Sequence, residues 1–168
     1  MNEDATPLYQ AVIGLDNQDY YLSYFRRADA RGYAPVSWHW PALFIGFFWL
    51  LYRRQYQWAL IYMSVSVGAL LTASVFYAMG AGSIVTPLYY AAMILFQAVY
   101  MPLHANAIYY RWVRNEVAAA RARYPGQSRQ QLEHLESRGG VFKSLPLVVV
   151  GILTLLMMLS APFTQMPE

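Results

Sequence analysis

Few side chains of this sequence could perform acid–base, metal or redox chemistry. There are three histidines and no cysteine, so thiolate ligands and disulfides are excluded. His39 and His104 both lie beside apolar stretches, and a pair of imidazoles in such places could ligate a haem iron. Single histidines at a membrane surface more often serve as polar anchors. We therefore expect no cofactor, and a haem-binding redox subunit remains an alternative.

Sequence motifs of common enzymes and transporters are missing. The sequence contains no HExxH, no phosphate-binding glycine loop and no serine elbow. Its two longest apolar stretches, residues 58–103 and 144–167, contain no charged side chain. Pumps and ion-coupled transporters place ionisable groups inside such stretches. We therefore expect no enzyme, no catalytic residue and no metal site.

The apolar stretches do carry small and polar residues at helical spacing. Ser64, Gly68 and Thr72 recur every four residues. They predict close helix packing, either against the neighbouring helix or against a second copy of the chain. Gln97 is the most polar side chain of its stretch and is expected to bond across a helix pair. A small channel or transporter subunit lined by Ser64, Thr72, Ser74 and Gln97 is a second alternative.

Aromatic and arginine residues flank the apolar stretches, and aromatic residues make up 17% of the sequence. Tryptophan and tyrosine concentrate at headgroup depth in membranes, and arginine pairs with lipid phosphates. We expect contact with lipid or with a partner from Trp38, Trp40, Trp49, Tyr52, Arg53, Arg54, Arg111, Trp112 and Arg114. The expected partners are anionic lipid headgroups and another membrane protein or a second copy, not nucleic acid.

Composition indicates that lipid surrounds the elements that carry these residues. The 168 residues are 58% apolar and only 12% charged, about half the charge of an ordinary soluble domain. A helix rises 1.5 Å per residue and needs about 20 residues to cross a bilayer. Residues 58–103, broken by Gly80, Gly82 and Ser83, therefore predict a transmembrane hairpin. Residues 144–168 predict a third span followed by a short outer tail.

The basic residues predict the orientation of these spans. All twelve lie between residues 26 and 57 or between 104 and 143, on one side of the hairpin. Lysine and arginine near span ends favour the cytoplasmic side. We therefore expect a cytoplasmic N-terminus and a periplasmic C-terminus.

Three further segments complete the predicted organisation. Residues 1–37 predict a cytoplasmic segment whose amphipathic helix carries a stripe of Tyr20, Tyr21, Tyr24, Phe25 and Ala28. This stripe suits either the membrane surface or the ends of the hairpin. Residues 38–57 predict an aromatic helix too short to span, which is interfacial or re-entrant, although a crossing stays open. Residues 104–143 predict a basic helical segment with a kink near Pro102.

One segment supports a family resemblance. Residues 40–53 read WPALFIGFFWLLYR, and Ala105, Asn106 and Tyr109 follow the hairpin. These motifs resemble a family of small bacterial membrane proteins catalogued as domain of unknown function 2628, over residues 20–113. The resemblance implies a bacterial inner membrane and no catalytic residues.

Taken together, the sequence predicts an all-α membrane protein. It would have three transmembrane helices, one short interfacial or re-entrant helix and cytoplasmic amphipathic helices. The expected function is that of a non-enzymatic inner-membrane accessory or assembly protein that acts through protein and lipid contacts.

Overall fold

A computed structural model describes residues 5–160, and their side chains up to residue 155. Its helices are α1 (Thr6–Ile13), α2 (Gln18–Arg31), α3 (Trp40–Tyr52), α4 (Tyr56–Phe76), η2 (Tyr77–Ala81), α5 (Gly82–Ile94), η3 (Leu95–Tyr100), α6 (Met101–Arg123), α7 (Ser128–Arg138) and α8 (Ser144–Ser160). Residues 5–160 contain no strand, so the predicted all-α class is confirmed for this part of the chain.

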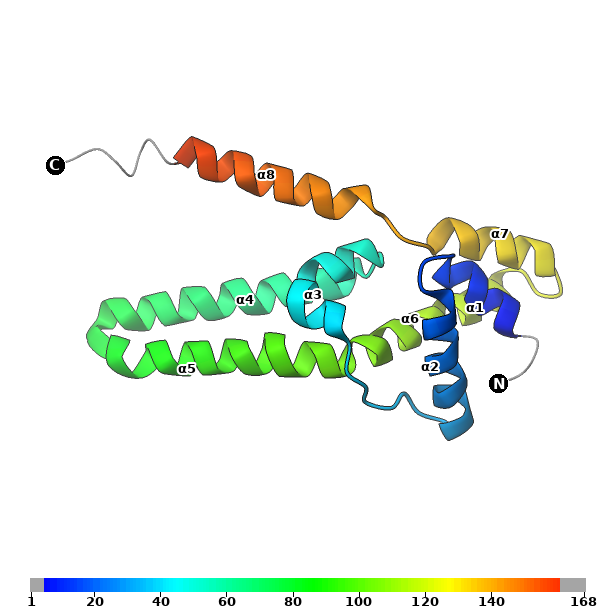
Figure 1. Ribbon diagram of the computed structural model, residues 1–168, viewed down its shortest axis with the longest axis horizontal. Coiled ribbons are helices and arrows are strands. Elements are labelled where there is room, and N and C mark those ends of the chain that lie inside the picture. Colours follow the sequence, from blue (N-terminus) through cyan, green and yellow to red (C-terminus); the bar gives the residue numbers. More distant parts are fainter. Residues whose placement is uncertain (1–4, 161–168) are drawn as a thin grey trace.

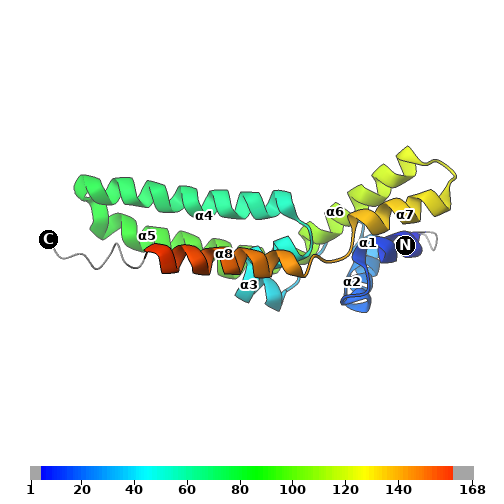
Figure 2. The ribbon, with the colours of Figure 1, turned by 90° about the horizontal axis from the view of Figure 1, so that it is seen from above.

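The molecule is elongated and has two unlike ends (Figure 1). Helices α4 and α5 form a hairpin that extends to one side. Helices α1, α2 and α7 gather around α6 at the other side, and we call these four helices the head. Helix α3 lies at the junction, and α8 extends in the same direction as the hairpin (Figure 2).

The hairpin turns where the sequence predicted. Gly80 has a φ of +86°, a left-handed conformation that glycine adopts without a steric penalty. Gln97 Nε2 donates a hydrogen bond of 3.2 Å to Ser66 Oγ on the facing helix, which confirms that Gln97 bonds across a helix pair. The Tyr62 and Phe96 rings lie 5.5 Å apart in the same interface.

The small-residue stripe does not take part in this interface. Ser64, Gly68 and Thr72 are exposed on α4, and a Cβ added to Gly68 would meet nothing within 4 Å. Internal packing of the stripe against the second hairpin helix is therefore wrong. Since the stripe turns away from α5, a second copy is the alternative that remains of the two.

A change of helical geometry precedes Pro102, as the sequence predicted. The wide π-helical turns of η3 end at Tyr100, and α6 begins with Pro102 in its first turn. Proline has no N–H and clashes with the preceding turn, which a widened turn accommodates. Helix α6 then continues the path of α5 into the head (Figure 1).

Aromatic residues from α2 and α6 form much of the core of the head. Tyr21, Tyr24, Phe25 and Ala28 are all buried, and the Phe25 ring lies 5.2 Å from that of Tyr110. Of the two interpretations of the α2 stripe, the membrane surface is therefore wrong for these four residues. They pack against α6 instead.

The apolar surface is concentrated in the hairpin. Among the described residues, only the helical stretch Tyr56–Arg123 is long and apolar enough to cross a membrane, and its most apolar 18-residue window has a mean hydropathy of 1.9. This stretch includes the turn at Gly80. Trp40–Tyr52 and Ser144–Leu155 are apolar but shorter, so three crossings do not follow from length and composition. Helix α8 contacts α3 and no other helix of the described chain.

Candidate functional site: a buried arginine beneath an aromatic cleft

Helix α3 starts with a histidine cap. The backbone N–H of Ala42 donates to His39 Nδ1 at 3.2 Å, and Pro41 occupies the first turn, where its missing N–H costs nothing. The neutral ring therefore carries its proton on Nε2, which lies 3.2 Å from the Tyr21 hydroxyl. Burial, together with the charge of Arg53, lowers the pKa of His39 to about 4.

Helix α3 is kinked and packs closely on the hairpin. Ile45, with φ −136° and ψ 37°, interrupts the helical geometry. The next residue, Gly46, leaves room for the Tyr62 ring, because an added Cβ would lie 3.4 Å from that ring. One face of α3 is thereby fixed against α4, and the opposite face, with Trp40 and Phe44, stays exposed.

At the other end of α3, Arg53 is enclosed by the head and only 1% exposed. Its Nη2 donates to the backbone carbonyl of Asp16 at 2.7 Å, and its Nη1 donates to that of Ile13 at 3.2 Å. The Ile13 carbonyl lies at the C-terminus of α1, where the helix dipole favours a cation. These bonds tie the α1–α2 connection to the end of α3.

Three tyrosine rings surround the same guanidinium. The Arg53 Cζ lies 4.4 Å from the ring centroid of Tyr21, 5.4 Å from that of Tyr109 and 5.5 Å from that of Tyr52. We call Arg53, the three rings and the two carbonyls the arginine cage. No carboxylate of the described chain forms an ion pair with Arg53, and its buried Nε has no hydrogen-bond partner. The cage therefore holds a cation without a neutralising anion.

Asn106 positions the elements around the cage. It is 1% exposed, and its Nδ2 donates to the Tyr20 hydroxyl at 2.7 Å and to Ser37 Oγ at 2.9 Å. One α6 side chain thus holds both α2 and the segment that leads into α3. The sequence marked Asn106 only through the family resemblance, and its role as a connector was not predicted.

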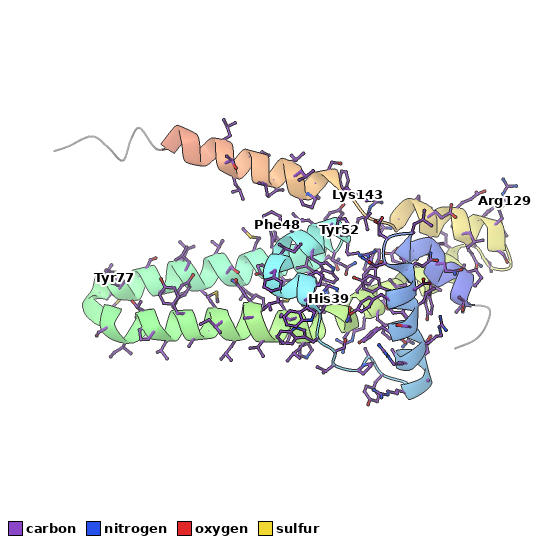
Figure 3. All side chains as sticks on the ribbon, viewed as in Figure 1. His39, Phe48, Tyr52, Tyr77, Arg129 and Lys143 are labelled. Carbon is purple, nitrogen blue, oxygen red and sulfur yellow. The ribbon has the colours of Figure 1, made fainter. Side chains whose placement is uncertain are left out.

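An open cleft of about 530 Å³ lies above the cage, between the start of α2, α3 and the start of α8. Its aromatic lining comprises Tyr20, Tyr21, Trp38, Trp40, Phe48, Trp49 and Tyr52. Arg53 lies at its inner end, and Lys143 borders it ahead of Pro146 and Leu147. Figure 3 shows Lys143, Tyr52 and Phe48 at the junction of head and hairpin, far from Arg129 in the first turn of α7. We call this the junction cleft.

Two of the predicted contact residues need correction. Trp49 is 3% exposed, with its ring 4.8 Å from that of His39, and Arg53 is confined to the cage. Neither presents the open surface that a lipid bilayer would cover, because the inner face of α3 packs on α6. Both still line the junction cleft, together with Trp38, Trp40, Tyr52 and Lys143, a residue that was not predicted from the sequence.

The remaining predicted contact residues lie elsewhere. Arg54, Arg111 and Trp112 border a separate hollow of about 580 Å³ between the start of α4 and α6. Arg54 Nη1 donates to the Ser137 carbonyl at 3.0 Å. Arg114 lies over the Tyr110 ring at 5.7 Å, on another side of α6. The predicted arginines therefore do not form one continuous patch.

The groups expected to line a channel do not converge either. Thr72 Oγ1 donates to the Gly68 carbonyl at 2.8 Å, and Ser74 Oγ donates to that of Leu70 at 2.9 Å. Both hydroxyls are on the outside of α4, whereas Gln97 faces the inside of the hairpin.

Haem ligation by His39 would break a hydrogen bond at whichever ring nitrogen bound the iron.

A comparison with models of known protein families shows to which family the chain belongs. The model described as Protein of unknown function (DUF2628) matches residues 17–114, which is more than half of the 168 residues. The chain belongs to the DUF2628 family. The predicted family is thus confirmed. Searches of the curated proteins and of the solved structures gave no match.

The DUF2628 match covers α2, α3, the hairpin and the first part of α6. It therefore includes Arg53 and the three rings of the arginine cage, as well as Asn106. Lys143 and α8, which complete the junction cleft, lie outside the matched residues. The family region thus supplies Arg53, the three rings of the cage and the whole aromatic lining of the cleft. The two carbonyls of the cage, from Ile13 and Asp16, and the exposed cation Lys143 lie outside it.

Proposed function

We propose that this DUF2628 protein is a non-enzymatic accessory or assembly protein of a bacterial inner membrane, acting through protein and lipid contacts. The observation that carries the proposal is the separation of two surfaces. The hairpin exposes apolar side chains along its length, and the head gathers the charged residues around an aromatic core.

The exposure of the hairpin supports lipid as its surroundings. Only 6% of its most apolar 18-residue window is buried, whereas the core helix of a soluble protein would be mostly buried. Leu71 is 61% exposed and Met79 is 74% exposed. Apolar surface costs about 25 cal/mol per Å² in water, so a hairpin of this kind is stable only when covered. Helix α4, with 21 residues, is about 32 Å long and matches the bilayer core.

In this arrangement α8 is the third crossing and α3 stays in one leaflet. Helix α8 has 17 residues, the lower limit for a span, and extends in the direction of the hairpin. Helix α3 has 13 residues, about 20 Å, and is kinked at Ile45. It suits a re-entrant or interfacial position, with Trp40 and Phe44 toward lipid. The basic head then lies in the cytoplasm.

The absence of cysteine makes the topology directly testable. Single cysteines would be introduced at Asn17, Ser83, Gln127 and Gln165, the last outside the described residues, and intact cells labelled with a membrane-impermeant thiol reagent. We expect labelling at Ser83 and Gln165 only, and labelling of all four after permeabilisation. Labelling of Asn17 but not Ser83 in intact cells would reverse the orientation, and purification as a lipid-free monomer without detergent would refute the membrane location.

The accessory role needs a separate experiment. The chain would be purified in a mild detergent, and retained proteins and lipids identified by mass spectrometry. We expect at least one of three companions: a membrane protein, a second copy of the chain or bound lipid. A bare monomer would contradict a role based on contacts.

A further inference from the structure

We infer that the junction cleft is a binding site for a single anionic phospholipid, with Lys143 as the side chain that contacts its phosphate. The inference rests on the proposed membrane location and adds to it a specific ligand, a specific site and a specific contact. Three properties of the cleft support the inference: its positive charge, the weak pairing of Lys143, and an apolar lining that continues toward α8.

The charge of the cleft is positive and incompletely neutralised. The caged Arg53 has no carboxylate partner among the described residues, only two carbonyls and three rings. Its buried Nε lacks a partner altogether. A charge in such a place acts through protein of low polarity, so its field reaches further than that of an exposed arginine. An anion in the cleft would complete the neutralisation from the open side.

Lys143 supplies the exposed part of this positive charge. Its Nζ lies 3.2 Å from Asp16 Oδ1, with 69% of the lysine side chain and 34% of the aspartate side chain exposed. Exposed ion pairs of this kind are weak and readily exchange partners. Lys143 can therefore turn from Asp16 to a phosphate in the cleft, where the nearby Arg53 adds its attraction.

The apolar lining suits the part of a phospholipid that follows the headgroup. Ile45 and Phe48 from α3 and Pro146 and Leu147 from α8 all line the cleft. These two helices contact each other there, and α8 then continues along the direction of the hairpin. A volume of about 530 Å³ lies within the range of small-molecule sites. It can hold a headgroup and the first part of an acyl chain, with the remainder in the bilayer.

The hollow between the start of α4 and α6 is less suited to bind an anion. Arg138 on its rim is already paired with Glu116 at 3.0 Å, and Arg54 is bonded to the Ser137 carbonyl. That hollow therefore contains its own carboxylate and lies beside the hydrophilic part of α6. The junction cleft combines an uncompensated cation with an apolar continuation into the membrane region.

The test compares lipid retention by matched variants. Protein in a neutral detergent would be titrated with dioleoylphosphatidylglycerol or dioleoylphosphatidylcholine, and the lipid-bound fraction measured by native mass spectrometry. Lys143→Gln should weaken retention of the anionic lipid about fivefold. Retention of the zwitterionic lipid should fall less, because its choline cation offsets the phosphate charge. Arg129→Gln removes the same charge at a side chain with 92% exposure, far from the cleft, and should match the parent chain. Equal losses in the two variants would overturn the site.

Two further variants separate charge from apolar contact. Asp16→Asn removes the competitor of Lys143 but keeps the backbone carbonyl that Arg53 needs, so it should strengthen retention of the anionic lipid. Phe48→Ala should weaken retention of both lipids, because it removes apolar lining and no charge. Retention of the anionic lipid that is unaffected by either change would overturn the proposed binding mode.

Because Lys143 is the single lysine of the sequence, its chemical modification can be used to distinguish binding of a lipid from binding of its free headgroup. Lys143 would be methylated reductively in detergent, and the modified peptide quantified by mass spectrometry. Phosphatidylglycerol should protect Lys143, and glycerol phosphate at the same concentration should not. Equal protection by both would make this a phosphate site rather than a lipid site. These variants should not affect thiol labelling of the hairpin tip. A negative result in the lipid-binding experiments would therefore not contradict the proposed membrane location.

Discussion

The guanidinium carbon of Arg53 lies 4.4 Å from the ring centroid of Tyr21, which joins the last turn of α3 to α2 through a cation and an aromatic face. The same guanidinium also bonds to the carbonyls of Ile13 and Asp16. One side chain therefore connects three segments of the chain at the base of the junction cleft.

Replacement of Arg53 should destabilise the head. Arg53→Met keeps the length of the side chain but leaves the two carbonyls without donors, and we expect a loss of about 3 kcal/mol in the free energy of unfolding. Arg53→Lys keeps the charge but cannot reproduce the planar fork, so its loss should be intermediate. Unfolding in detergent followed by near-ultraviolet circular dichroism measures both. Arg129→Gln is the control, and a stable Arg53→Met variant would show that the cage is dispensable.

The cap of α3 should make stability depend on pH. The pKa of His39 falls from 6.5 to about 4 on folding, so the folded chain binds fewer protons than the unfolded chain between these values. The stabilisation by neutral His39 is complete above pH 6.5 and is lost as the pH falls toward 4. The loss should reach about 3 kcal/mol.

This pH dependence has a matched pair of variants. His39→Asn retains a side-chain acceptor for the Ala42 N–H but does not titrate, and its stability should change less between pH 6.5 and 4. His134→Asn alters an imidazole on α7 and should keep the full dependence. Chemical denaturation at several pH values measures the difference, and parallel curves for His39→Asn and the parent chain would contradict the assignment.

Two glycines should respond in opposite ways to a methyl group. Gly139 lies against the backbone of Val12, and a Cβ there would overlap with that backbone, so Gly139→Ala should push α7 from α1. We expect a loss of about 2 kcal/mol, typical of overpacking. Gly68 has open space around it, and Gly68→Ala should raise stability by up to about 1 kcal/mol through its helix propensity. Thermal unfolding compares them. A destabilised Gly68→Ala variant would instead reveal a covered surface on α4.

The hydrogen bond between Gln97 and Ser66 should contribute modestly to hairpin stability. A double-mutant cycle of Gln97→Leu and Ser66→Ala should give a coupling energy of about 0.6 kcal/mol, as is typical of polar pairs between membrane helices. Unfolding in detergent measures the four proteins of the cycle. Thr72→Ala is the comparison, because its hydroxyl bonds only to its own helix at the Gly68 carbonyl. Additive effects of the two changes would mean that the bond contributes nothing.

The hairpin and its turn could be predicted because they depend on local properties. A long uncharged stretch interrupted at Gly80 predicts two helices that form a hairpin. Gln97 is the polar group within reach of the facing helix. These features need only the length of apolar runs and the few residues that interrupt them.

The environment of the arginines could not be predicted in the same way. Arg53 and Arg54 are adjacent in sequence, yet one is caged and the other reaches the Ser137 carbonyl at the edge of the head. The difference depends on Tyr109 and on the carbonyl of Ile13, both more than 35 residues away in sequence. The rings of α2 were ambiguous for a related reason, because tyrosine suits both a headgroup layer and an aromatic core.

The continuous path from α5 through η3 into α6 has a mechanical consequence. Twenty-three residues of α6 make an arm of about 35 Å, anchored at one end in the hairpin and at the other in the head. If bilayer thickness changed the tilt of α5 by about 10°, the far end of a rigid arm would be displaced by roughly 6 Å. The widened turns of η3 are the place where such a lever would bend, and their stiffness sets how much of a change in lipid thickness would be transmitted to the head.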